Sequence, residues 1–525
     1  MSSAGPAESL TGPLVPQRRW RVALAARSRR APAWLLSQAR RVPAAGRACF
    51  LIAFVNAAIW GFVVPPFQVP DEVAHFGYAQ YLAETGKPPP QSVAPPYSPE
   101  EQTTLEALDF FTVIGRPHLR GILTPAEDRR LRSIQAANRN PVGPGGVTSV
   151  TNQPPLYYAL EAVPYWLSPS SNILARLALM RLLSALMAAG TVLGVFMFVR
   201  ELFPSTRWAW TVGALVVAFQ PTFDFIAAGV HADNLLFLAS TWLLFTLLRT
   251  YRRGLTVRRG AAIGALTAIG LLSKLTFIAL TPGIALALAL LVARAWRSDR
   301  RVAWQGGLTC VAVAGVPFAI YAVLNETAWH RGGPTAGGIA AATANVIVGG
   351  EPVSLNESFD YIWQIYLPRL GFMHHRYFAH YPGWELWLNG AIGHFGWLDY
   401  GFPKWVYELG RYLFFALSAL GLVTLYRVRR GLQTLAPIFF CFGVMALGLL
   451  AAIGYTGIRY KLSTGHQFEQ ARYLFPFIAM WGAFVVLAAK GVGRRWAPVL
   501  GGILVVAAMA HGLFAETLTI SRYYG

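Results

Sequence analysis

Residues 173–199 read ILARLALMRLLSALMAAGTVLGVFMFV. The run is longer than the roughly 20 apolar residues that a helix needs to cross the hydrocarbon of a bilayer. Its only charged residues are Arg176 and Arg181, both near its start. The run therefore predicts a membrane-spanning helix.

Further apolar runs of this kind lie on both sides of it. They are approximately 48–64, 208–227, 234–250, 260–273, 276–295, 302–324, 408–427, 434–455, 472–489 and 496–516. Of the 525 residues, 55% are hydrophobic and only 13% are charged, whereas a soluble domain carries about 25% charged residues. The sequence predicts an all-α, polytopic membrane protein with about 11 transmembrane helices.

The charged residues predict the orientation of the chain. Every second connection between the runs is rich in Arg or Lys, as cytoplasmic loops are. The other connections, which hold most of the acids and nearly all the histidines, are 65–172, 228–233, 274–275, 325–407 and 456–471. We therefore expect these connections, with any site they form, to lie outside and the N-terminus to lie in the cytoplasm. The net charge of +21 follows from this loop pattern, so we expect the bilayer, and no nucleic acid, as a partner.

The domain organisation follows from the same pattern. Residues 1–47 form a basic cytoplasmic tail, and residues 48–525 form one transmembrane domain. The segments 65–172 and 325–407 are rich in aromatic residues, and we expect them to be two large ordered external loops. Within the first loop, Pro154–Ser168 is too short to span and predicts an interfacial helix with tyrosines, Tyr157 among them, at headgroup level.

Two adjacent acids follow the first span, in the stretch Pro70-Asp71-Glu72-Val73-Ala74-His75. If a helix begins here, His75 lies one turn after the acids. A carboxylate fixed at this point can act as a general base toward a sugar or lipid hydroxyl. The alternative is a pair of acids that caps a helix.

Polar residues also mark the other external connections. Gln153 could bind sugar hydroxyls, or simply precede a proline-initiated helix. His231 and Asp233 stand at a short turn, where an acid and a histidine could ligate a metal ion. No ligand spacing there is diagnostic, so we assign no metal site and no certain cofactor, and a divalent cation stays an alternative.

Two cations lie at external turns between apolar runs. Lys274 occupies a very tight turn, and Arg472 begins the tenth span in the stretch Gln470-Ala471-Arg472-Tyr473. Each could bind a phosphate at the bilayer surface. Each could also serve only as an interfacial anchor.

Taken together, these motifs resemble the C-type (GT-C) superfamily of membrane glycosyltransferases. Within it, the chain most resembles a bacterial family of predicted polytopic membrane proteins of unassigned function. The motifs are P-D-E-x-x-H at Pro70–His75, Q-P-P-L-Y-Y at Gln153–Tyr158, H-A-D-N at His231–Asn234, the Lys274 turn, G-x-F-G-W at Gly393–Trp397, and Q-A-R-Y-L-F-P at Gln470–Pro476.

The resemblance implies inverting glycosyl transfer from a polyprenyl-phosphate sugar to a cell-envelope acceptor, which is a glycan, a lipid or a protein. It implies a site on the external face of a bacterial cytoplasmic membrane. Asp71 would be the general base, with Glu72 as its partner or substitute. The substrate-binding residues would be His75, Gln153, Tyr157, His231, Asp233, Lys274, Gln470 and Arg472. The alternatives are a transporter or flippase of lipid-linked glycans and a non-catalytic scaffold of envelope assembly.

Overall fold

The computed structural model describes residues 42–90, 96–121, 124–136, 150–168, 172–331, 354–378, 382–467 and 469–525. Nearly all of the predicted basic tail, 1–47, lies outside these residues. In the described residues the protein is all-α apart from one two-stranded ribbon, β1 (His394–Phe395) paired with β2 (Tyr400–Gly401). The predicted all-α, polytopic fold is confirmed.

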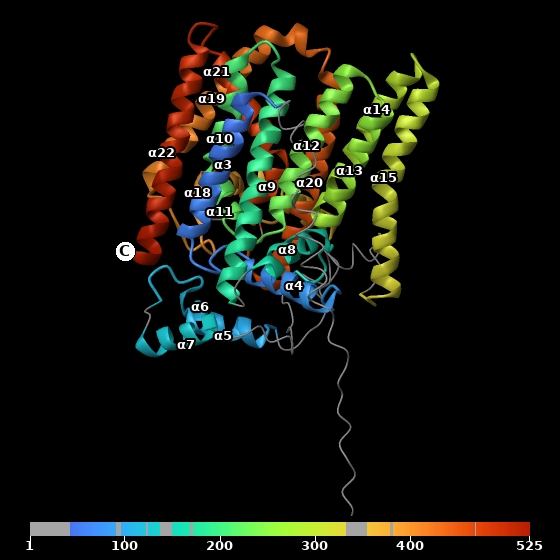
Figure 1. Ribbon diagram of the computed structural model, residues 1–525. Coiled ribbons are helices and arrows are strands. Elements are labelled where there is room, and N and C mark those ends of the chain that lie inside the picture. The colour runs from blue at the N-terminus through green and yellow to red at the C-terminus, as the bar shows by residue number, and fades with distance from the viewer. Residues whose placement is uncertain are drawn as a thin grey trace, which may run out of the picture.

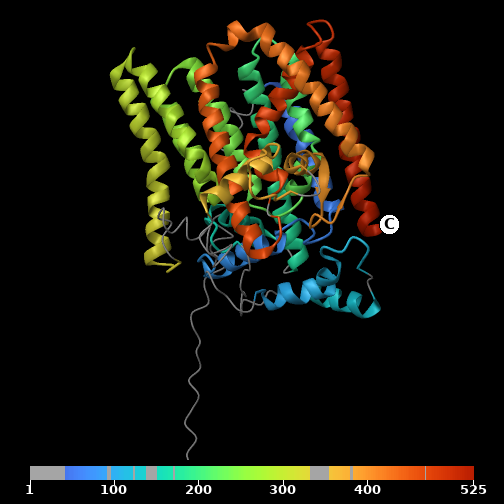
Figure 2. The ribbon, with the colours of Figure 1, turned by 180° about the vertical axis from the view of Figure 1, so that it is seen from behind.

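A bundle of long helices forms the body of the molecule (Figures 1 and 2). Its helices are α3 (Ala44–Val63), α9 (Ile173–Leu202), α10 (Arg207–Ala218), α11 (Pro221–Ala227), α12 (Asp233–Arg253), α13 (Val257–Ser273), α14 (Thr281–Trp296), α15 (Arg300–Thr327), α19 (Lys404–Leu432), α20 (Ala436–Thr464), α21 (Ile478–Lys490) and α22 (Ala497–Tyr524). The 3-10 helices η1 (Leu275–Leu280) and η2 (Ala471–Phe477) lead into α14 and α21. Helix α9 is central and packs against α3, α10, α12 and α21.

The number of spans differs from the expected eleven. By length and composition, eight helices in the described residues could cross a membrane, and the bent pair α10 and α11 would make a ninth. Helix α13 falls short because it has only 17 residues. Helix α12 begins with Asp233 and Asn234 and ends with Arg252 and Arg253, which dilute its apolar character.

The pair α10 and α11 corresponds to the single predicted run 208–227. The chain bends there by 63°, because α10 ends at Ala218 and Pro221 starts a new helix three residues later. Proline has no backbone N–H and favours the first turn of a helix over its interior.

Shorter helices gather at one end of the bundle (Figure 1). The described parts of segment 65–172 form α4 (Glu72–Thr85), α5 (Pro99–Ala107), α6 (Phe110–Val113), α7 (Pro125–Ala136) and α8 (Leu156–Leu167). We refer to this end of the bundle as the cap end. Segment 325–407 contributes α17 (Leu355–Tyr366), α18 (Gly383–Gly393) and the β1–β2 ribbon. Helix α18 lies beside α11, further into the bundle (Figure 1).

The predicted interfacial helix corresponds to α8, but the expected position of its tyrosines is wrong. Tyr157, Tyr158 and Tyr165 are fully buried, and Trp166 is the one aromatic residue of α8 that is exposed. Helix α8 packs against α4 and α9, so protein rather than lipid headgroups surrounds these rings.

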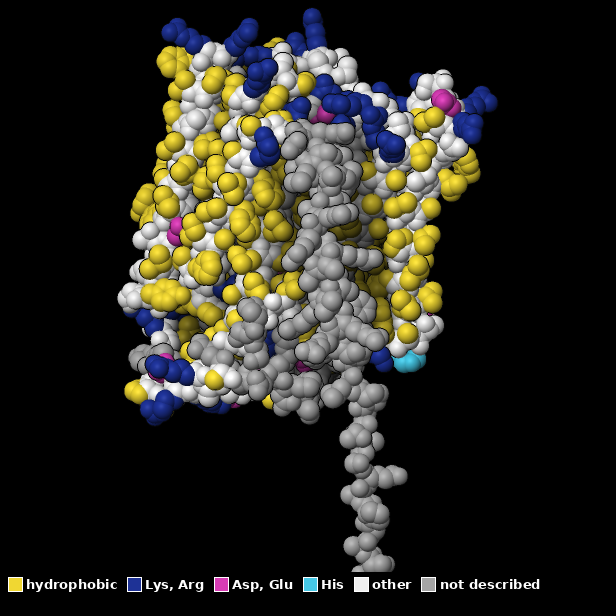
Figure 3. Space-filling model, viewed as in Figure 1, with side chains coloured by type: hydrophobic (Ala, Val, Ile, Leu, Met, Phe, Trp, Pro, Cys, Tyr) yellow, Lys and Arg dark blue, Asp and Glu magenta, His cyan; other side chains and the backbone are white. Residues whose placement is uncertain are grey.

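Lys and Arg side chains gather at the end of the bundle opposite the cap end, and a smaller group lies at the cap end itself (Figure 3). The connections that carry the larger group follow α9, α12, α14 and α19. On the face that Figure 3 shows, the surface between these two ends is mainly apolar, as contact with lipid requires.

Candidate functional site

The turn that leads from α3 into α4 holds Asp71 in an unusual conformation. Its φ of 63° places it in the left-handed region, which non-glycine residues rarely adopt and which costs on the order of 1–3 kcal/mol. Asp71 occupies the N-cap position of α4, yet its side chain makes no capping hydrogen bond within the described structure. The side chain is instead 36% exposed and reaches Arg472. Helix capping therefore does not explain Asp71.

Arg472 lies at the start of η2 and joins three elements. Its Nη2 donates to Asp71 Oδ2 at 2.8 Å, and its Nη1 lies 3.0 Å from His231 Nε2. Its Nε lies 3.9 Å from Asp233 Oδ2. The side chain is 4% exposed, so its charge is balanced mainly by these protein groups.

Lys274 supplies a second cation on the other side of Asp233. Its Nζ lies 2.6 Å from Asp233 Oδ1, while His231 Nδ1 lies 3.3 Å from Asp233 Oδ2. The extended backbone of Lys274 separates α13 from η1. Gln153 supports this turn, because its Oε1 accepts a hydrogen bond of 3.1 Å from the Leu275 backbone N–H.

His75 completes the group from α4. Its Nδ1 lies 2.9 Å from the Tyr158 hydroxyl, and its ring centroid is 4.2 Å from that of His231. We call Asp71, His75, His231, Asp233, Lys274 and Arg472 the polar cluster. The structure thus brings together six of the predicted site residues from four separate parts of the chain.

The electrostatics of the polar cluster favour a charged aspartate beside neutral histidines. Burial tends to raise the pKa of Asp71, but His231 and the charge of Arg472 outweigh it and hold that pKa far below its usual range. Burial lowers the pKa of His75, and the neighbouring His231 lowers it further. Burial also lowers the pKa of His231, against the opposing effect of Asp233. Both imidazoles are therefore neutral at pH 7.

Glu72 faces away from the polar cluster. Arg181 of α9 binds it with two hydrogen bonds, Nε to Oε1 at 2.8 Å and Nη2 to Oε2 at 2.6 Å. The same guanidinium donates to the carbonyls of Gly61, Val64 and Pro65, and the Val230 backbone N–H donates to Glu72 Oε1 at 3.0 Å. Glu72 and Arg181, which we call the clamp, join the end of α3, the start of α4 and the turn that carries His231.

Two further predicted residues lie at the edge of the polar cluster. The Tyr157 hydroxyl is 3.3 Å from Ser184 Oγ, on the α9 side, so its polar end points into the protein core. Gln470 instead lines a cavity next to Arg472.

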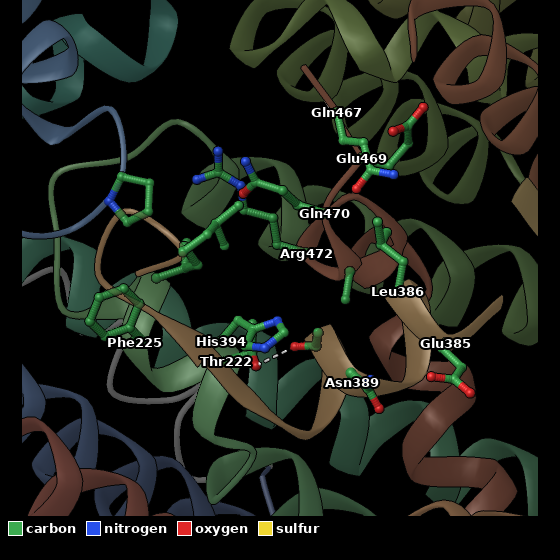
Figure 4. A pocket seen from close by; sticks show the side chains of 15 residues that line it. Thr222, Phe225, Glu385, Leu386, Asn389, His394, Gln467, Glu469, Gln470 and Arg472 are labelled. Atoms are coloured by element: carbon green, nitrogen blue, oxygen red, sulfur yellow. Dashed lines mark hydrogen bonds between the residues drawn. The ribbon is translucent and has the colours of Figure 1, made fainter. Parts of the chain in front are cut away.

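This cavity has a volume of about 400 Å³ and lies between α11, α18 and the chain leading into η2. Its lining residues are Pro70, Thr222, Phe225, Ile226, Glu385, Leu386, Asn389, Gly390, His394, Leu398, Gln467, Glu469, Gln470, Ala471 and Arg472. Figure 4 shows Arg472 and Gln470 on one side of an open centre, with Thr222 and His394 facing them. Such a volume falls within the range of about 300–1,000 Å³ that is usual for small-molecule sites.

Sequence reasoning missed several residues of this region. Arg181 gave a signal as one of two charges in an apolar run, but nothing in the sequence paired it with Glu72. Tyr158 was expected only at headgroup level, and its stacking on Tyr78, with centroids 3.6 Å apart, has no sequence signal. Asn389 of α18 likewise had none.

The chemistry of the polar cluster suits an anion better than a metal ion. Across the described residues, no group of three or more His, Cys, Asp or Glu side chains has the geometry to hold a metal. Arg472, which lines the cavity, and Lys274 are cations of the kind that bind phosphate oxygens. Asp71 is a carboxylate that can accept a proton.

A family model described as "Predicted membrane protein (DUF2142)" matches residues 54–481. The match covers most of the chain and contains every residue of the polar cluster. No curated protein matches the sequence.

Proposed function

We propose, from the premise that this chain belongs to the DUF2142 family of predicted membrane proteins, that it is a membrane glycosyltransferase. It transfers a sugar from a polyprenyl phosphate to a hydroxyl of a cell-envelope acceptor. The observation that carries this proposal is the ion pair between Asp71 and the buried Arg472 at the edge of the cavity. A base and an anion-binding cation stand side by side there, as displacement of a phosphate by a hydroxyl requires.

The reaction assigns a role to each group. Asp71 accepts the proton of the acceptor hydroxyl, whose oxygen attacks the anomeric carbon as the bond from that carbon to the phosphate oxygen breaks. The polyprenyl phosphate leaves with the bonding electrons. Arg472 and Lys274 stabilise its negative charge, as preorganised cations do in phosphate chemistry.

The low pKa of Asp71 gives the reaction an order. A carboxylate held by Arg472 is a weak base. A donor phosphate that binds Arg472 competes with Asp71 for the guanidinium, so the pKa of Asp71 rises toward its ordinary value. Binding of the donor therefore activates the base, and Asp71 is the base in this proposal because the clamp occupies Glu72.

The location of the site rests on the charge pattern. Lys and Arg gather mainly at the end opposite the cap end (Figure 3), and positively charged loops stay in the cytoplasm. We therefore place the N-terminus inside a bacterial cytoplasmic membrane and the polar cluster on the external face, where polyprenyl-phosphate sugars and envelope acceptors meet.

Sugar transfer in membranes that contain the protein tests this proposal. We expect Asp71→Asn to lower the transfer rate by about 10²-fold or more, because a general base contributes that much. Asp109→Asn is the matched control, since Asp109 is also left-handed at a helix start, with φ 51°, and makes no capping bond within the described chain. Equal transfer by the Asp71→Asn and Asp109→Asn proteins would exclude Asp71 as the base. Transfer no faster than in membranes without the protein would favour a scaffold role.

One observation favours a transporter as the second candidate. Transporters often bind substrates at broken helices, and the α10–α11 pair is bent by 63° next to the buried Asp224. Translocation of a fluorescent polyprenyl-phosphate sugar across proteoliposomes, without transfer to an acceptor, would support this alternative.

A further inference from the structure

The cavity next to Arg472 has positive and negative side chains at different places in its lining, and the proposed function assigns no role to the negative ones. Arg472 lies at one side, and two acids, Glu385 and Glu469, are also among the lining residues. Arg411 pairs with Glu385 at 2.8 Å but is not itself a lining residue. The cavity therefore offers one place for an anionic group and several acceptors of hydrogen bonds.

The remaining polar groups suit hydroxyls. Asn389, Gln467 and Gln470 bring amide groups, which donate and accept hydrogen bonds. The Oδ1 atom of Asn389 is fully buried and has no hydrogen-bond partner among the described residues. A buried acceptor without a partner is costly, so a donor supplied by a bound molecule would satisfy it.

The apolar lining is also informative. Phe225, Ile226 and Leu386 form flat or branched apolar surface beside these groups. A sugar ring presents both C–H faces and hydroxyl edges, so a lining of mixed character matches it better than a purely ionic ligand.

We propose that this cavity is the subsite for a neutral sugar ring of the substrate, whose anionic neighbour meets Arg472. Asn389 and the amides of Gln467 and Gln470 bind its hydroxyls. Glu385 and Glu469 accept hydrogen bonds from the same ring and repel sugars that carry a carboxylate. This inference rests on the proposed function for the identity of the anionic group, and it names the class of sugar that the site takes.

The test measures binding to the full-length protein in lipid nanodiscs. The probes are farnesyl phosphate, its esters with glucose, galactose, mannose and arabinose, and its ester with glucuronic acid. We expect at least one neutral ester to bind about tenfold more tightly than farnesyl phosphate, which is the worth of one or two hydrogen bonds. The glucuronate ester should bind no more tightly than farnesyl phosphate.

Variants separate the subsite from the phosphate site. Asn389→Leu should abolish the tenfold gain of the neutral ester and leave the affinity for farnesyl phosphate unchanged, which also shows that the variant is folded. Gln433→Leu, at an exposed position after α19, is the control and should change neither affinity. Glu469→Gln should strengthen binding of the glucuronate ester.

The outcomes distinguish this inference from the proposed function. If no neutral ester binds more tightly than farnesyl phosphate, or if the glucuronate ester binds equally well, the subsite is overturned while the phosphate site stands. If the neutral esters bind as expected but no transfer occurs, the transferase proposal fails and the subsite stands.

Methyl glycosides of the same sugars identify the source of the ring. If a methyl glycoside binds together with farnesyl phosphate, and the neutral ester prevents this binding, the cavity holds the donor sugar. Binding of a methyl glycoside together with the neutral ester places the donor sugar elsewhere and assigns the cavity to an acceptor sugar.

Discussion

Asp71 shows how single residues in this molecule depend on distant partners. Its left-handed backbone is uncommon, and the groups that surround it come from the turn before α12 and from η2. Its neighbour Glu72 has a different environment. It is the next residue along the helix, so its side chain points in another direction, toward Arg181 of α9. Two adjacent acids of similar chemistry thus have separate partners.

The buried histidines predict how stability depends on pH. In the unfolded chain a histidine takes up a proton below about pH 6.5, whereas the folded pKa of His75 lies well below that value. The unfolded state then binds more protons, so the unfolding temperature should fall as the pH drops below 6.5.

The variant His75→Gln removes one of these groups. It should flatten the decline of unfolding temperature between pH 6.5 and 5, measured in detergent. An unchanged slope would show that His75 is protonated in the folded protein.

At the scale of elements, the clamp is the contact that fixes the geometry of the polar cluster. It holds the end of α3, the start of α4 and the turn before α12 around one guanidinium. Both side chains are almost fully buried, so removal of one charge leaves the other uncompensated.

We expect Glu72→Gln to lower the free energy of unfolding by about 3 kcal/mol, the low end for a broken buried pair, because three carbonyls still accept from Arg181. The control is Glu106→Gln, which breaks the exposed pair with Arg130 and should cost less than about 1 kcal/mol. Denaturation of the purified proteins gives both values. Equal losses would contradict a structural role for the clamp.

At the scale of the whole molecule, the orientation can be tested with two serines. Ser133 is exposed on α7 at the cap end, and Ser298 is exposed between α14 and α15 at the opposite end. The native cysteines Cys49, Cys310 and Cys441 are buried and should give little background. We expect a membrane-impermeant maleimide to label Ser133→Cys in intact cells and Ser298→Cys only after permeabilisation. The reverse pattern would place the polar cluster in the cytoplasm.

The sequence predicted the fold class because long apolar runs of this kind form membrane-spanning helices and few other structures. It also predicted that Asp71, His231, Lys274 and Arg472 lie on one face, since each stands at an alternate connection. It could not separate Asp71 from Glu72, because their difference depends on one backbone angle and on an arginine 109 residues away. The cavity lay beyond prediction for a similar reason, since α18 meets α11 and η2 only in the folded bundle.

Helix α9 also has a consequence for how the protein is made. Two of its three arginines pair with acids that precede them in the chain, Arg176 with Glu100 and Arg181 with Glu72. Synthesis proceeds from the N-terminus, so both acids already exist when α9 leaves the ribosome. The helix can neutralise its charges as it inserts, without waiting for later segments. A permuted gene that began at α9 would present two bare arginines to the insertion machinery.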